Sequence, residues 1–68
     1  MPSDELLTTA ELGALIKVPA TTLRQWRHRG VGPVGFRIEN GRVRYRRSAV
    51  ELWLADQEHA DAARRVAE

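Results

Sequence analysis

The sequence predicts a small α+β domain in which two short helices are followed by a two-stranded β-hairpin and a third helix. Three observations predict this fold class. The stretches that begin at Thr8 and at Ser48 both have the Ser/Thr-x-x-Glu spacing of a capping box, which marks the start of a helix. Between them, residues 36 to 45 alternate between apolar and polar side chains around Asn40-Gly41, as in a hairpin. A chain of 68 residues has room for one domain with a thin core.

The first helix is expected over about residues 8 to 16. Leu12, Leu15 and Ile16 follow the cap at the i, i+3, i+4 spacing of an apolar helical face. Pro19 ends the helix, because proline has no N–H to donate and disfavours a helical residue before it. The same proline is well placed to open a second helix, since the first turn of a helix has no partner for that N–H.

The second helix is expected to run from Pro19 to a stop at Gly30, so that the two helices form a helix-turn-helix. Leu23 and Trp26, three residues apart, mark its inward side. Arg27 and Arg29 lie on its flanks. The outward side and its edge carry donors and acceptors of the kind that read base edges in DNA: Thr21, Thr22, Arg24, Gln25 and His28.

The hairpin is expected to turn through Asn40-Gly41 as a two-residue type I′ turn. This turn fixes four cross-strand pairs: Glu39 with Arg42, Ile38 with Val43, Arg37 with Arg44 and Phe36 with Tyr45. The apolar members of these pairs then share one face, and the charged members share the other. Because Arg37 opposite Arg44 is an unfavourable like-charge pair, an anion is the expected neighbour of the charged face.

The third helix is expected to begin after Arg46 and Arg47, where Ser48 and Glu51 form the second capping box. Val50, Trp53 and Leu54 repeat the apolar spacing and should close the core over the first two helices. The architecture is therefore that of a minimal winged helix-turn-helix. The expected divisions are an N-terminal tail (1–7), the winged helix-turn-helix domain (8–57) and a C-terminal tail or helix extension (58–68).

Positive charge is concentrated in the middle of the chain. Residues 17 to 47 contain nine basic residues and one acid, Glu39, while the segments before and after this block each sum to −3. A basic block of this density is the electrostatic footprint of a protein that binds nucleic acid, whereas a solvated charged face usually mixes both signs. Ten of the eleven basic residues are arginine, which suits bidentate binding of phosphate and guanine and would also follow from a GC-rich genome.

Several other classes of protein are disfavoured by what the sequence lacks. There is no cysteine, and the two histidines are isolated, so disulfides and a zinc site are not expected. No apolar run is long enough to span a bilayer, and the acidic N-terminus is a poor signal peptide, which predicts a soluble intracellular protein. No paired-carboxylate site, triad or phosphate-binding glycine loop points to an enzyme, and no metal or cofactor is expected.

Two runs of the sequence, LLTTAELGALIKVPATTLRQWRHRG and GRVRYRRSAVELWL, resemble the small winged-helix domains of the excisionase family. These domains are similar to the DNA-binding domain of MerR-type regulators. The resemblance covers residues 6 to 54 and rests on the leucine-threonine start, on TTLRQW and on R-x-R-Y-R-R. The sequence departs from the family at Pro19, where many relatives have a serine cap. It also has no long coiled-coil helix or effector domain, so the resemblance does not imply small-molecule sensing.

The resemblance implies an excisionase, or recombination directionality factor, encoded by a phage or mobile element. Such a protein binds and bends attachment-site double-stranded DNA and helps an integrase, a tyrosine or serine recombinase, to carry out excision. It would act in the cytoplasm of a bacterial host, at the nucleoid. By this likeness Thr21, Thr22, Arg24, Gln25 and His28 would read the major groove. The backbone or minor groove would be bound by the wing and its flank: Arg37, Arg42, Arg44, Arg46 and Arg47.

Two other functions fit the same residues. A small MerR-like transcriptional regulator would have the same DNA-binding surface, and genomic position beside an integrase gene would separate it from an excisionase. A winged module of a phage terminase small subunit, used in DNA packaging, would use the basic face only to assist assembly. Leu52 and the weakly apolar C-terminal stretch offer contacts for head-to-tail self-association on DNA.

Overall fold

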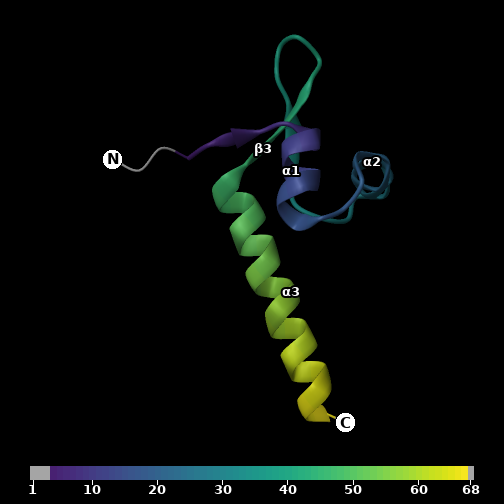
Figure 1. Ribbon diagram of the computed structural model, residues 1–68, viewed down its shortest axis with the longest axis vertical. Coiled ribbons are helices and arrows are strands. Elements are labelled where there is room, and N and C mark those ends of the chain that lie inside the picture. The colour runs from purple at the N-terminus through teal and green to yellow at the C-terminus, as the bar shows by residue number, and fades with distance from the viewer. Residues whose placement is uncertain (1–3, 68) are drawn as a thin grey trace.

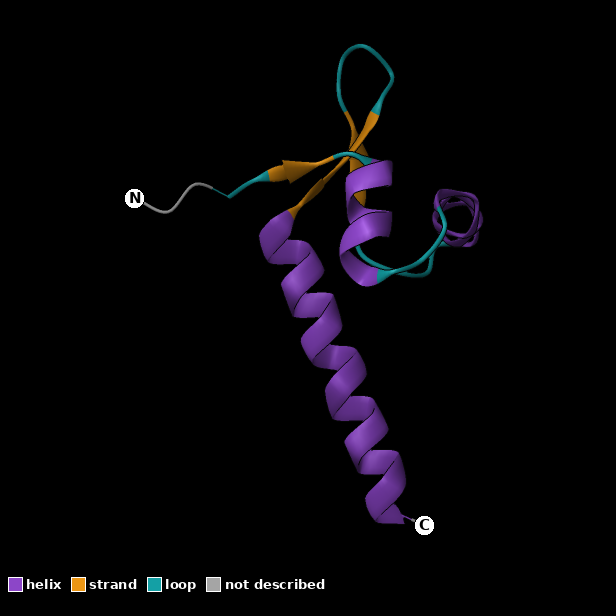
Figure 2. Cartoon of the chain, viewed as in Figure 1, coloured by secondary structure: helices purple, strands orange, loops and turns teal. Residues whose placement is uncertain are grey.

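Two short helices, a small sheet and one long helix follow one another in the computed structural model, which describes residues 4–67 (Figures 1 and 2). The helices are α1 (Thr9–Ile16), α2 (Ala20–Arg29) and α3 (Arg47–Ala67). The strands are β1 (Leu6–Leu7), β2 (Gly35–Arg37) and β3 (Val43–Arg46), which form an antiparallel sheet in the order β1-β3-β2. The predicted α+β fold with a helix-turn-helix and a wing is confirmed.

Helix α1 begins as predicted, with both hydrogen bonds of the capping box. The Glu11 N–H donates to the Thr8 hydroxyl at 3.0 Å, and the Thr8 N–H donates to the Glu11 carboxylate at 2.8 Å. Leu12 is fully buried, whereas Leu15, which belongs to the predicted apolar stripe, is 41% exposed. The predicted cap of α1 is therefore confirmed, whereas its predicted apolar face is only partly buried.

The turn between α1 and α2 is tight because Gly13 has no side chain. A Cβ at this position would lie 2.6 Å from the Val18 carbonyl oxygen, which is too close for any residue other than glycine. Lys17 adopts a left-handed conformation at the end of α1, with φ of 59°. Pro19 occupies the N-cap position of α2 rather than its first turn, so α2 begins at Ala20.

Helix α2 ends at Gly30, as predicted, in a left-handed conformation with φ of 75°. Leu23 is buried, and Trp26 packs against the core on the same side. The Trp26 ring lies 5.7 Å from the ring of Trp53, measured between centroids, at an interplanar angle of 49°. This aromatic pair couples α2 to α3 and confirms that Trp26 lies on the inward side of α2.

The sheet contains a third strand that the sequence analysis assigned to the N-terminal tail. Leu6 pairs with Arg46 and Leu7 with Tyr45, so β1 covers the edge of β3 that the wing leaves open. Two residues are too few to produce a recognisable alternating pattern, which explains why β1 was missed. Residues 1–3 of the predicted tail lie outside the described residues.

The predicted register of the hairpin is wrong by one residue. A type I′ turn requires positive φ at both central residues, but only Gly41 has one, at 82°. The Gly41 N–H donates to the Ile38 carbonyl at 2.8 Å, and the Ile38 N–H donates to the Arg42 carbonyl at 2.9 Å. The loop therefore has three residues, with glycine in its left-handed position. The observed strand pairs are Gly35 with Tyr45, Phe36 with Arg44 and Arg37 with Val43.

This shift changes what the wing presents on each face. Arg37 lies opposite Val43, so the predicted like-charge pair of Arg37 and Arg44 does not exist. Phe36, which was predicted to share a face with Tyr45, pairs with Arg44 instead, and the Arg46 guanidinium lies 5.8 Å from the centre of its ring. Gly35 takes the place opposite Tyr45, where a Cβ would lie 2.6 Å from the tyrosine ring.

Helix α3 starts near the predicted residue but uses a different cap. Ser48 does not bond with Glu51; its N–H and its hydroxyl both donate to the Asp4 carboxylate, at 3.0 and 2.7 Å. The predicted second capping box is therefore wrong. A sequence motif considers only nearby residues, whereas the strand pairing of β1 with β3 brings Asp4 to this helix from 44 residues away.

The core is small and lies where α1, α2, the sheet and the start of α3 meet. Its buried side chains are Leu7, Leu12, Leu23, Tyr45 and Val50. The second half of α3 leaves the core, and every residue from 55 to 65 is exposed (Figure 1). The C-terminal segment was predicted to be either a tail or a helix extension, and residues 58–67 continue helix α3. Glu68 lies outside the described residues.

Candidate nucleic-acid interface

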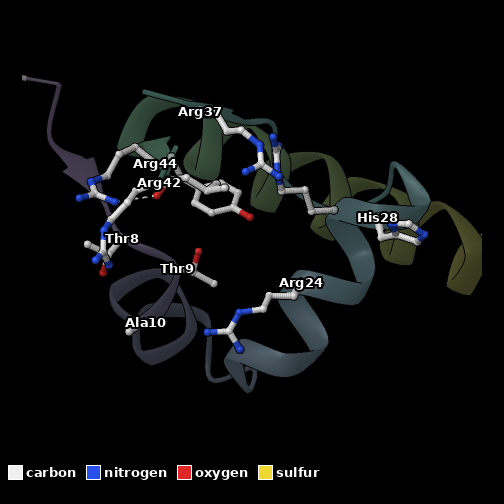
Figure 3. Close-up of a pocket in the computed structure, with 11 residues that line it drawn as sticks. Thr8, Thr9, Ala10, Arg24, His28, Arg37, Arg42 and Arg44 are labelled. Carbon is white, nitrogen blue, oxygen red and sulfur yellow. Dashed lines mark hydrogen bonds between the residues drawn. The ribbon is translucent and has the colours of Figure 1, made fainter. Parts of the chain in front are cut away.

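An arginine-rich cleft of about 740 Å³ lies between α2, the wing and the start of α1 (Figure 3). We call it the arginine cleft. Its lining contains five arginines and no acid, and consists of Thr8, Thr9, Ala10, Arg24, Arg27, His28, Arg37, Arg42, Val43, Arg44 and Tyr45. A cleft with this lining concentrates positive potential and attracts polyanions.

Helix α2 contributes one wall because its basic residues recur at helical spacing. Arg24, Arg27 and His28 stand at i, i+3 and i+4, so they share a face that turns towards the wing. Arg24 and His28 are exposed, while Arg27 is half-buried and its Nη1 donates to the Gly35 carbonyl at 3.2 Å. This bond links α2 to β2.

The wing contributes the opposite wall, with arginines whose heads bind only backbone carbonyls. Arg37 Nη1 donates to the Gly41 carbonyl at 3.2 Å, and Arg44 Nη1 donates to the Val43 carbonyl at 2.9 Å. Arg42 is exposed. Among residues 4–67, no salt bridge involves any of the five cleft arginines. Their charge is therefore available to a ligand.

One acid lies close to the cleft without lining it. The pKa of the Glu11 carboxyl lies below its ordinary value, first because the Thr8 N–H donates to it and next because of its contact with the Thr8 hydroxyl. The charge of Arg44 lowers this pKa further. Glu11 is thus ionised at neutral pH and held in the cap of α1.

The structure brings together half of the residues predicted to contact DNA. Those that line the arginine cleft are Arg24, His28, Arg37, Arg42 and Arg44. Gln25 lies outside it, where it forms a shallower hollow of about 390 Å³ with Arg24, His28 and Arg29. Thr21 is exposed and Thr22 half-buried on α2, and neither lines the cleft.

The two remaining predicted residues, Arg46 and Arg47, are paired with acids. Arg46 Nη1 lies 3.6 Å from the Asp4 carboxylate, and Arg47 Nη1 lies 3.7 Å from that of Glu5. Arg47 Nε is also 3.4 Å from the Glu51 carboxylate. The pKa of Asp4 lies below its ordinary value, chiefly because the Ser48 N–H donates to it, with further contributions from the Ser48 hydroxyl and the charge of Arg46. We call Arg46 and Arg47 the junction arginines.

Several residues of the cleft lining were not predicted from the sequence as binding residues. Arg27 was placed only on the flank of α2, although its i+3 relation to Arg24 was available. Thr8 and Thr9 were read only as the start of a helix, and Tyr45 only as core. No local pattern could have placed α1 and Tyr45 beside α2, because that requires the tertiary packing.

Within the part of the chain that the structure describes, no helix is long and apolar enough to cross a membrane. Residues 4–67 also contain no cluster of three or more side chains suited to a metal ion.

Comparison with known protein families agrees with this fold. The model of a family described as a helix-turn-helix domain matches residues 6–58, from β1 into α3. No curated protein is a significant match to the chain. The matched segment contains α1, α2, the wing and every residue of the arginine cleft. Because the match covers more than half of the chain, the protein belongs to the helix-turn-helix domain family, which includes excisionase-like DNA-binding proteins.

Proposed function

We propose that this protein is an excisionase, which binds attachment-site DNA in a sequence-specific manner, bends it and directs an integrase towards excision. The observation that carries the DNA-binding part is the arginine cleft, which gathers five arginines without ion-pair partners from α2 and the wing. Phosphate contacts of this kind provide most of the affinity of such proteins and make it dependent on salt.

In this proposal α2 enters the major groove and the wing follows the backbone or the adjacent minor groove. Thr21, Arg24, Gln25 and His28 are exposed on α2, and Thr22 lies at the edge of the same surface. Helix insertion of this type is the usual docking mode of a helix-turn-helix, in which side chains of the second helix contact base edges. Arg37, Arg42 and Arg44 of the wing, with the junction arginines, then contact phosphates or the minor groove.

The excisionase role is supported by the sequence resemblance rather than by the cleft itself. TTLRQW lies in α2, and R-x-R-Y-R-R spans β3 and the start of α3, so both motifs belong to the DNA-facing part of the fold. In this role the protein performs no bond chemistry, since the integrase cuts and joins the strands. It acts at the nucleoid, in the cytoplasm of a bacterial host.

Footprinting on an attachment-site fragment, with and without the cognate integrase, tests this function. We expect protection of discrete sites beside the crossover region, an altered integrase footprint, and a bend detected by circular permutation of the site within the fragment. Excision in a reconstituted reaction should depend on the protein. Protection of a promoter fragment with no effect on integrase would instead identify a transcriptional regulator. Binding only in the presence of packaging proteins would identify a terminase module.

A further inference from the structure

The floor of the arginine cleft contains a hydroxyl group that the protein itself does not use. Tyr45 is only 3% exposed, yet it lines the cleft. No side-chain hydrogen bond within residues 4–67 involves its hydroxyl. Every buried side-chain oxygen or nitrogen within residues 4–67 has a hydrogen-bond partner. Because the Tyr45 hydroxyl has no partner, it is not fully buried. It therefore opens on the cleft with its donor free.

The start of α1 supplies two more free donors to the same cleft. The first N–H groups of a helix have no carbonyl partner within the helix and carry the positive end of its dipole. The capping box occupies the N–H groups of Thr8 and Glu11. Those of Thr9 and Ala10 make no hydrogen bond with the described residues, and both residues line the cleft. Figure 3 shows the Thr9 side chain pointing into the hollow between Arg44 and Arg24.

The arrangement of these groups follows from the strand pairing. Leu7 of β1 lies opposite Tyr45 of β3, and α1 begins two residues after Leu7. The start of α1 is thereby held beside Tyr45. Arg27 and Arg44, whose heads are fixed by carbonyls of β2 and β3, add charge from the two walls. The charged side chains that line the cleft are all cationic, so the complementary ligand is an anion.

We propose that the arginine cleft holds one phosphodiester group of the DNA backbone, bound by the Tyr45 hydroxyl and by the N–H groups of Thr9 and Ala10. This inference rests on the proposed DNA-binding function and adds α1 and Tyr45 to the contact surface. Two of the three donors belong to the backbone of α1 and the third to the buried side chain of Tyr45, unlike those of the long arginine side chains. The bound phosphate therefore sets the depth and register of α2 in the major groove, and the arginines supply long-range attraction.

The first test is a duplex in which single backbone phosphates are replaced, one at a time, by neutral methylphosphonates. With the wild-type protein, one position should weaken binding by about tenfold, as expected for loss of charge-assisted hydrogen bonds. Tyr45→Phe keeps the ring and loses only the unpaired hydroxyl, so its thermal stability should match that of the wild type. It should bind unmodified DNA about tenfold more weakly and lose much of its sensitivity at that one position.

The outcomes separate this inference from the proposed function. Undiminished affinity of Tyr45→Phe would overturn the inference while DNA binding stands. The inference would also be overturned if Tyr45→Phe bound DNA more weakly but kept the wild-type loss of affinity at every methylphosphonate position. If the wild type itself shows no salt-dependent binding to duplex DNA, the proposed function falls together with the inference.

A second variant tests the N–H groups independently of Tyr45. Thr9→Pro removes one N–H at the first helical position, where proline is well tolerated, and the extended Thr8 (ψ of 167°) suits a following proline. Thr9→Ala changes the same side chain and keeps the N–H. We expect Thr9→Pro to bind several-fold more weakly than Thr9→Ala on cognate and scrambled duplexes alike, with helix content unchanged by circular dichroism. Equal affinities would overturn the role of α1.

Discussion

The arginine cleft and the junction arginines differ in one respect, namely whether an acid lies within reach. The five cleft arginines have only carbonyl partners or none, whereas Arg46 and Arg47 pair with Asp4, Glu5 and Glu51. Arg44 and Arg46 are two residues apart on the same strand, so neither residue type nor local charge density separates the groups. Asp4 and Glu5 come from the N-terminal segment, which β1 brings against β3, while Glu51 lies one turn along α3 from Arg47. Charge available to DNA therefore depends on tertiary structure.

The junction arginines serve the fold before they serve any ligand. They lie where β3 passes directly into α3, and the Arg47 N–H donates to the Glu5 carbonyl at 2.9 Å. Their ion pairs are exposed, and pairs of this kind contribute little free energy, so a phosphate can replace an acid at small cost. We expect them to assist DNA binding more weakly than the cleft arginines do.

The largest effect should come from removing positive charge from the arginine cleft, and removing it from the junction arginines provides the comparison. Arg37→Ala/Arg44→Ala should weaken binding to any duplex by about 100-fold at low salt, at about tenfold for each lost phosphate contact. Arg46→Ala/Arg47→Ala should weaken it only several-fold, because both side chains already have acid partners. Fluorescence anisotropy with one labelled duplex measures both variants. Equal losses would show that the ion pairs at the junction do not withhold charge from DNA.

A second variant separates reading of bases from binding of phosphates. Gln25 is exposed on α2 outside the arginine cleft. Gln25→Ala should reduce the preference for a cognate over a scrambled site by about 1 to 3 kcal/mol, the value of a bidentate base contact. Arg24 lines both the arginine cleft and the hollow that contains Gln25. Arg24→Ala should therefore reduce both the preference for the cognate site and the affinity for any duplex. If Gln25→Ala weakens both duplexes equally, α2 is not the element that reads bases.

The smallest effect concerns Asp4, which caps α3 and pairs with Arg46. Its pKa in the folded protein lies below the ordinary value of 3.8, so the ionised carboxylate stabilises the fold above that pH and loses this role as the pH falls through the folded pKa. Asp4→Ala should therefore lower Tm modestly at neutral pH, and the difference from wild type should shrink below about pH 4.

The control for this variant is Glu58→Ala, which removes one charge from an exposed position of α3 that has no ion pair within the described residues. DNA affinity of Asp4→Ala should not fall, because Arg46 is released. A Tm difference that persists unchanged in acid would show that the carboxylate charge of Asp4 is not what stabilises α3.

Local signals in the sequence predicted much of the fold. The Thr8 cap, the stop at Gly30 and the buried Leu23 depend on neighbours within one or two turns, and all three are confirmed. The hairpin register failed because a three-residue loop and a two-residue turn both use Gly41, and only the backbone conformation of Asn40 separates them.

Features that depend on distant parts of the chain could not be predicted. Strand β1 pairs with residues 38 and 40 positions away, and the Asp4 cap requires a contact across 44 residues, whereas local spacing favoured Glu51 as the partner of Ser48. The place of Tyr45 in the lining of the cleft could not be predicted, because an aromatic residue in an alternating strand indicates core. The basic composition predicted a binding surface, but not which arginines would lack acid partners.

The central claim is that the unpaired arginines of the cleft bind DNA phosphates, and the dependence of affinity on salt tests it most directly. If five or six phosphates are neutralised, log K against log salt should fall with a slope near −5, at roughly 0.9 per phosphate. Arg37→Ala/Arg44→Ala should reduce the magnitude of that slope by about two. A wild-type slope shallower than about −2, or a slope that the cleft substitutions leave unchanged, would contradict the account.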